Sequence, residues 1–211
     1  MADEYRSFVE DARPGTDETL AEAIVWNPVV QTLTLMVVVS VATWLSTFAG
    51  FGRDLFVLTA PLAAHPWTLV TSVYAHVGPG HLLSNAVVLV VAGGLVAMST
   101  SWLRFHLFFV VTGATAGAVQ VLALSLFGLP IGVLGASGAV FALVGYVLTS
   151  NILSKGIFDR LRVPSWAVLL ALVVIALVLT MQYSAPGSAL VAHFTGATVG
   201  LVAGRFRLLH V

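Results

Sequence analysis

The most constraining feature of this sequence is a series of six apolar segments, each close to the length that a helix needs to cross a lipid bilayer. A transmembrane helix requires about 20 apolar residues, because the hydrocarbon core is about 30 Å thick and a helix rises about 1.5 Å per residue. Apolar residues make up 59% of the 211 positions, more than one globular core of this length can bury. We therefore expect an all-α, polytopic membrane protein with transmembrane helices at residues 29–49, 81–98, 105–127, 137–153, 165–182 and 189–204.

The chain divides into an N-terminal tail and a membrane domain. Residues 1–28 are polar, and we expect a tail there, with a short helix near residues 18–23. Residues 29–211 are expected to form the six-helix domain, without a further soluble domain. The connection at 50–80 is long and rich in apolar side chains, so we expect it to lie in the membrane interface. No cleavable signal peptide is expected, because the tail is acidic and the first apolar run follows no basic start.

The basic residues predict the orientation in the membrane. With six spans, both termini and the loops 99–104 and 154–164 lie on one side. That side carries eight basic residues: Arg6, Arg13, Arg104, Lys155, Arg160, Arg162, Arg205 and Arg207. The opposite side carries only Arg53. Because loops rich in Lys and Arg stay in the cytoplasm, we expect a multi-pass protein of the plasma membrane with both termini cytoplasmic.

Polar side chains gather at the starts of the even-numbered helices, which this orientation places at the outer face. The second helix opens with His76, His81 and Asn85, the fourth with Ser137 and the sixth with His193. A polar side chain inside a membrane helix is costly and is therefore a candidate functional group. The fourth segment has only 17 residues, about 25 Å at helical rise, so its start should lie below the outer surface in a wet cavity.

These residue types predict a serine hydrolase that opens to the outer face. A serine hydroxyl becomes a good nucleophile when a base takes its proton, and imidazole does so near neutral pH. We therefore expect Ser137 as nucleophile and His193 as base. The start of a helix offers free backbone N–H groups and a positive dipole end beside Ser137, which suit a developing oxyanion. His81 and Asn85, four residues apart on one helical face, can add side-chain donors.

The scarcity of acidic residues excludes several other classes of protease. No Asp or Glu lies between Asp54 and Asp159, so no acid completes a Ser-His-Asp triad and no pair of membrane aspartates exists. The chain also lacks an H-E-x-x-H helix and any cysteine, which excludes the membrane zinc proteases that use that motif and excludes thiol catalysis. Zinc bound by His76, His81 and His193 remains an alternative on residue types. The five-residue gap between His76 and His81, however, does not place them on one helix face. We expect no metal, no cofactor and no nucleic-acid partner.

The motifs resemble those of the rhomboid intramembrane serine proteases. The sequence has H-x4-H-L-x2-N at the second helix, G-A-S-G-A at the fourth and A-H-x2-G-x3-G-x3-G at the sixth. The resemblance covers about residues 29–204 and implies a six-helix rhomboid bundle of the minimal form common in prokaryotes. It implies cleavage of membrane-anchored protein substrates, within the lipid bilayer, by a Ser137–His193 dyad. The oxyanion site would consist of His81, Asn85 and the Ser137 amide, and the helix at 165–182 would flank a lateral substrate gate.

The sequence departs from the rhomboid pattern in its first long loop. Members of the family usually carry Trp-Arg there, whereas this chain has Trp67-Thr68. The glutamate expected near the end of the second helix is also missing, around Ala97 and Met98. The two charges typically form a pair in the family, so their joint loss strands no buried charge. This departure affects the anchoring of the loop rather than the chemistry.

Three further residues are expected to support the site. His76 and Gly135 belong to the matched motifs, and Phe141 lies one turn after the serine, where its ring can stack on His193 but offers no hydroxyl. Small residues are expected to hold the fourth and sixth helices together, because glycines at four-residue spacing allow two helices to approach closely. The glycines of the sixth helix are Gly196, Gly200 and Gly204, and the facing residues of the fourth are Gly138, Ala142 and Gly145.

Two functions of other classes compete with proteolysis. A non-catalytic rhomboid-like protein, which binds membrane proteins and directs their quality control, would be expected to lack the serine or the histidine, and this chain has both. A small transporter would be expected to carry charges in the membrane or broken half-helices in matching halves, and neither pattern occurs. The sequence therefore favours an intramembrane serine endopeptidase.

Overall fold

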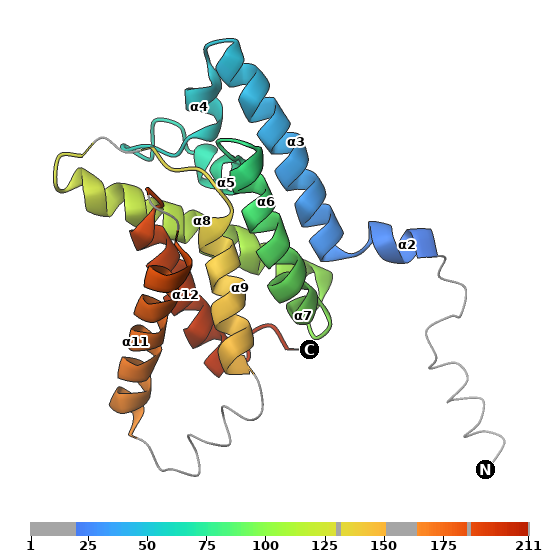
Figure 1. Cartoon of the computed structure of the whole chain (residues 1–211), viewed down its shortest axis with the longest axis vertical. Helices are drawn as coiled ribbons and strands as arrows, with labels where there is room; N and C mark the ends of the chain where they lie inside the picture. The colour runs from blue at the N-terminus through green and yellow to red at the C-terminus, as the bar shows by residue number, and fades with distance from the viewer. Residues whose placement is uncertain (1–19, 130–131, 151–163, 185–186, 211) are drawn as a thin grey trace.

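The fold is that of a helical bundle, as a computed structural model of the chain shows (Figure 1). The structure describes residues 20–129, 132–150, 164–184 and 187–210. Over these ranges the regular elements are all helices, and the extended backbone pairs only in an isolated bridge between Leu58 and Val133. The prediction of an all-α membrane bundle is confirmed.

The main helices coincide with the six apolar segments of the sequence. They are α3 (Pro28–Phe48), the continuous run of α6 (Pro79–Val88), η1 (Leu89–Gly93) and α7 (Gly94–Ala97), α8 (Trp102–Ser125), α9 (Ser137–Ser150), α11 (Ser165–Tyr183) and α12 (Leu190–Arg205). Among the described residues, α3, the run from α6 to α7, α8 and α11 are long and apolar enough to cross a membrane. Helix α9 is apolar but has 14 residues, and α12 has 16.

Part of the predicted cytoplasmic side lies outside the described residues. Residues 1–19, which include Arg6 and Arg13, are outside them. So are residues 151–163, which include the end of the fourth predicted span and three basic residues of the following loop. The short helix expected in the tail is described as α2 (Leu20–Val25), which turns away from the axis of α3 (Figure 1). The division of the chain at residue 28 stays a prediction.

The long first connection contains two short helices, α4 (Gly52–Phe56) and α5 (Thr68–Tyr74), and is held by neutral hydrogen bonds. The indole N–H of Trp67 donates to the carbonyl of Asp54 at 3.0 Å, and the Thr68 hydroxyl donates to the carbonyl of His65 at 2.6 Å. Leu58 is fully buried and exchanges two 2.9 Å backbone hydrogen bonds with Val133. The loop is therefore fixed against the segment that leads into α9 without the Trp-Arg pair.

Helices α9 and α12 pack backbone against backbone. A Cβ atom on Gly196 would overlap the carbonyl oxygen of Gly138, and one on Gly200 would overlap the carbonyl oxygen of Ala142. In the reverse direction, a Cβ on Gly145 would lie 2.6 Å from the carbonyl oxygen of Ala197. Only glycine permits this approach, because any side chain would occupy the space of the neighbouring backbone. The predicted contact between the small residues of these two helices is confirmed.

Helix α8 crosses the bundle and contacts both α9 and α12 (Figure 1). Its rings Phe105 and Phe109 are fully buried in a cluster with Met36 of α3, Val73 of α5 and Leu143 of α9. Helix α11 lies at the outside of the bundle and packs on α12. The pair α9–α12 is therefore anchored on one side by α8, and α11 covers another side.

We expect Gly200→Ala to lower the thermal stability of the folded protein in detergent. The added methyl group would overlap the carbonyl oxygen of Ala142, and overpacking of this kind costs about 1–3 kcal/mol. Gly94→Ala is the matched control, because its Cβ would meet open space in a helix, and helix propensity alone favours alanine by about 1 kcal/mol. The melting temperatures of both variants are measured by circular dichroism. Equal melting temperatures for the two variants would contradict the close contact.

Candidate active site

Ser137 is the first residue of α9 and is half-buried. The chain reaches it through a sharp bend at Gly135, whose φ of +131° favours glycine. The Gly135 amide donates to the carbonyl of Ser72 at 2.8 Å, and a Cβ here would lie 2.6 Å from the Cε1 atom of His81. Backbone conformation and space both require glycine at this position. The bend leaves the N–H groups at the start of α9 without helical partners, beside the Ser137 side chain.

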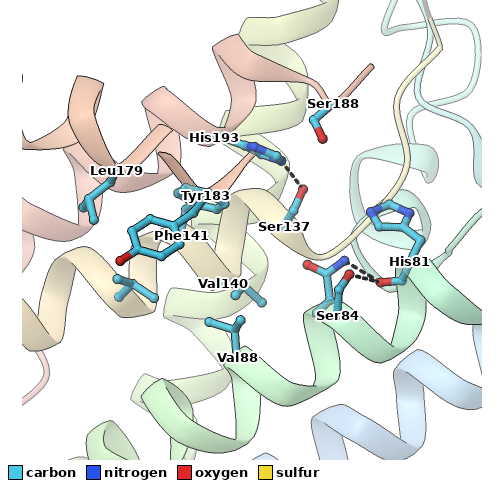
Figure 2. Close-up of a pocket in the computed structure, with 12 residues that line it drawn as sticks. His81, Ser84, Val88, Ser137, Val140, Phe141, Leu179, Tyr183, Ser188 and His193 are labelled. Carbon is cyan, nitrogen blue, oxygen red and sulfur yellow. Dashed lines mark hydrogen bonds between the residues drawn. The ribbon is translucent and has the colours of Figure 1, made fainter. Parts of the chain in front are cut away.

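His193 lies in the first turn of α12, opposite Ser137. Its Nε2 atom is 2.8 Å from the Ser137 Oγ atom (Figure 2). The Phe141 ring stacks on the imidazole with centroids 4.4 Å apart and planes 12° from parallel. The side chain is 5% exposed, so protein surrounds the ring almost completely. The close packing of α9 and α12 thus places a serine and a histidine in hydrogen-bond contact.

Two polar residues that the sequence analysis did not single out hold the start of α12 and the His193 ring. The Oε1 atom of Gln120, on α8, accepts a 3.0 Å hydrogen bond from the amide of Ala192. Ser184, directly after α11, places its Oγ atom 2.6 Å from the Nδ1 atom of His193. Gln120 is a lone amide in the apolar span 105–127, a signal that could have identified it. Ser184 had no such signal, because it follows the apolar segment 165–182 in the sequence rather than lying inside it.

His81 and Asn85 lie in the first two turns of α6 and line the same cavity as Ser137. Figure 2 shows His81 on the α6 side of the site. The Asn85 side-chain N–H group donates to the carbonyl of His81 at 2.9 Å, and the Ser84 hydroxyl donates to the same carbonyl at 2.9 Å. The Nδ1 atom of His81 is buried and has no hydrogen-bond partner among the described residues. The side of α6 that faces Ser137 is therefore polar.

His76 lies behind the site rather than in it. Its ring is fully buried, with Nδ1 3.1 Å from the carbonyl of Tyr74 and 3.0 Å from the Oγ atom of Ser40. The Nε2 atom accepts from the amide of Ala136 at 3.4 Å, next to Ser137. Burial, assisted by the nearby His81, lowers the pKa of His76 to about 4, so the ring is neutral at physiological pH. His76 thus connects the loop before α6 to α3 and to the start of α9.

Three serine–histidine contacts occur in the described residues, one at His76 and two at His193, and the two histidines differ in their access to a cavity. Ser40 and His76 are fully buried and line no described cavity. Ser137 and His193 line a cavity of about 370 Å³ (Figure 2). Its polar end consists of His81, Ser84, Asn85, Ser137, Ser188 and His193, and its apolar part of Val88, Val140, Phe141, Val144, Leu179 and Tyr183. The contact between Ser137 and His193 therefore borders a space that a ligand could enter.

The structure brings five of the seven predicted site residues to this cavity: Ser137, His193, His81, Asn85 and Phe141. Gly135 and His76 support it from behind through the bend before α9. The described residues contain no group of three or more His, Asp or Glu side chains arranged to hold a metal ion, so the three histidines of the zinc alternative do not form such a group. The arrangement places a serine hydroxyl, an imidazole and polar side chains of α6 around one space.

Comparison with known proteins agrees with the motifs. A family model described as the Rhomboid domain matches residues 63–210. The chain is 27% identical over 177 residues to the Rhomboid protease GlpG of Haemophilus influenzae, and the match covers 81% of this chain and 87% of that protein. The region that matches the family model contains every residue of the candidate site. Because that region is well over half of the 211 residues, the chain belongs to the rhomboid family.

Proposed function

We propose that this protein is a serine endopeptidase that cleaves membrane-anchored protein substrates with a Ser137–His193 dyad. Membership of the rhomboid family and similarity to a rhomboid protease support the general activity of an intramembrane protease. The observation that carries the assignment of the dyad is the 2.8 Å contact between the Ser137 Oγ atom and the His193 Nε2 atom at the wall of a cavity. The proposal needs no metal and no cofactor.

The proposed reaction proceeds through an acyl-enzyme. His193 Nε2 takes the hydroxyl proton of Ser137 as Oγ attacks the carbonyl carbon of the scissile peptide bond. When the C–N bond breaks, the protonated imidazole gives that proton to the leaving amine. A water molecule then transfers a proton to His193 and attacks the ester carbon. When the C–O bond to Ser137 breaks, the imidazolium returns that proton to Oγ, which releases the acid and restores both residues. The polar end of the cavity, which extends to Ser188, provides room for this water.

We assign the oxyanion site to the Ser137 amide, His81 and Asn85. The amide lies at the start of α9, where the helix dipole is positive. His81 and Asn85 line the cavity from the opposite side and supply an imidazole ring and a side-chain amide as donors in this proposal. Negative charge on the tetrahedral intermediate would then lie between a backbone donor and side-chain donors.

The apolar part of the cavity suits a transmembrane substrate that enters from the side. Val88 of α6 borders it on one side, and Leu179 and Tyr183 of α11 border it on the other. Helix α11 packs on α12 through Leu172 and Ala176 and exposes most of its remaining apolar surface. We propose that a substrate helix approaches between α6 and α11, and that the site opens to the outer face of the plasma membrane with both termini in the cytoplasm.

The dyad is tested by Ser137→Ala and His193→Ala. Each should lower cleavage of a fluorogenic transmembrane reporter by on the order of 10³-fold or more without loss of folding. The double variant should be little slower than either single variant, because nucleophile and base act as a unit. Ser40→Ala is the matched control, since it removes a serine from the buried contact with His76, and it should cleave within a few-fold of the natural chain.

The dyad assignment would be wrong if the two losses were strictly additive or if Ser40→Ala were the inactive variant. A natural chain that binds the reporter and never cleaves it would instead support the second candidate, a non-catalytic rhomboid-like protein that binds membrane proteins.

Asn85→Ala tests the oxyanion site. A donor aimed at the transition state lowers kcat and kcat/KM together when it is removed, and we expect a loss of roughly 10-fold or more, since one donor alone is worth about 10²–10³. Ser84→Ala is the control, because its hydroxyl donates to the same His81 carbonyl, and a change of less than about threefold is expected. Melting is measured on the same preparations. A fall in stability with normal kcat would assign Asn85 to packing instead.

The orientation is tested with single cysteines, because the natural chain has none. Gly80→Cys lies at the exposed start of α6 and Ser101→Cys at the exposed start of α8, at opposite ends of the bundle. An impermeant maleimide added to intact cells should label the first variant, and should label the second only after permeabilisation. The reverse pattern would contradict the orientation derived from the basic residues.

A further inference from the structure

Both ring nitrogens of His193 contact a serine hydroxyl. The Nε2 atom is 2.8 Å from Ser137 Oγ, and the Nδ1 atom is 2.6 Å from Ser184 Oγ. Ser184 is half-buried and directly follows Tyr183, the last residue of α11. The ring therefore connects the start of α9 to the end of α11, and its two hydrogen bonds come from different elements.

The two contacts have different chemical requirements. For Nε2 to accept the Ser137 proton, the neutral ring must carry its hydrogen on Nδ1. The Nδ1–H group then donates to Ser184 Oγ, and the Ser184 hydroxyl serves as an acceptor. Without an acceptor at Nδ1, the other tautomer would become more populated, and that tautomer presents an N–H group to Ser137 and cannot act as a base.

The stacking contact of the His193 ring with Phe141 does not favour either tautomer. The stacked Phe141 ring holds the plane of the imidazole, but a stacked face is the same for both tautomers and for a ring rotated by half a turn about Cβ–Cγ. The described residues contain only two acidic side chains, Glu22 and Asp54, and neither lines the cavity. A neutral hydroxyl thus occupies the place that a carboxylate has in a Ser-His-Asp triad.

We propose that Ser184 is a positioning residue that selects the basic tautomer and the orientation of His193. The inference rests on the proposed dyad and extends it by a third group, so that the hydrogen-bonded chain runs from Ser137 through His193 to Ser184. Ser184 does not touch the substrate carbonyl, and no proton leaves it. When His193 becomes an imidazolium, its Nδ1–H bond to Ser184 strengthens, because one partner is then charged.

Ser184→Ala and Ser184→Thr test this role in the full-length protein in detergent. We expect Ser184→Ala to lower kcat for a fluorogenic transmembrane reporter roughly three- to tenfold, the effect of one neutral hydrogen bond, with KM changed less than about twofold. Labelling of Ser137 by a fluorophosphonate should slow by a similar factor, because it also needs the base. Ser184→Thr retains a hydroxyl acceptor and should restore the rate to within about twofold.

Thr180→Val is the matched control on the same helix. It removes a buried hydroxyl of α11 that donates to the carbonyl of Ala176 at 2.9 Å, within its own helix, and it should leave kcat and labelling unchanged. Melting temperatures of all variants show whether folding is affected.

Each outcome decides between specific alternatives. If labelling requires both Ser137 and His193, the dyad is intact. Wild-type kcat and wild-type labelling in Ser184→Ala would then overturn the positioning role alone. Equal losses in Ser184→Ala and Ser184→Thr, or an equal loss in Thr180→Val, would assign the effect to the packing of α11 and would also overturn it. If the natural chain is labelled no faster than Ser137→Ala, the dyad itself fails and the role of Ser184 fails with it.

Discussion

The backbone contact between α9 and α12 is the interaction on which the rest of the structure depends. Gly196 and Gly200 of α12 lie against the carbonyl oxygens of Gly138 and Ala142 of α9, so no side chain separates the two helices. This proximity brings Ser137, at the first residue of α9, within 2.8 Å of His193 in the first turn of α12. In a membrane, where apolar burial does not drive helices together, such packing is the main source of association. The same glycines therefore serve stability and the site.

The polar groups of the site are held almost entirely by neutral hydrogen bonds. Gln120 fixes the start of α12, Ser184 contacts the Nδ1 atom of His193, and His76 accepts from the amide that precedes Ser137. Unpaired charge is costly at this depth, and the long first loop is likewise fixed by donors such as the Trp67 indole. A site built from neutral partners avoids that cost.

Much of the fold and of the candidate site could be predicted from the sequence because the membrane constrains both. Apolar segments of fixed length predicted the helices, and the rarity of polar residues inside them made Ser137, His193, His81 and Asn85 stand out. Ser184 could not be predicted, because its contact with His193 depends on how closely the end of α11 lies to the first turn of α12. Nor could the sequence separate the buried contact of Ser40 with His76 from the one at the cavity, since both are ordinary residue types.

The sequence by itself determined the number and length of the membrane helices, the glycine surface of α12 and the order of the three polar helix starts, because each follows from local composition and spacing. The tertiary structure decided which histidine meets which serine, which of these contacts borders a cavity and which neutral side chains contact His193. These features depend on distances between α6, α9, α11 and α12 that are set by packing. A hydrogen bond requires atoms within about 3 Å, and no pattern along the chain specifies a separation in space to that precision.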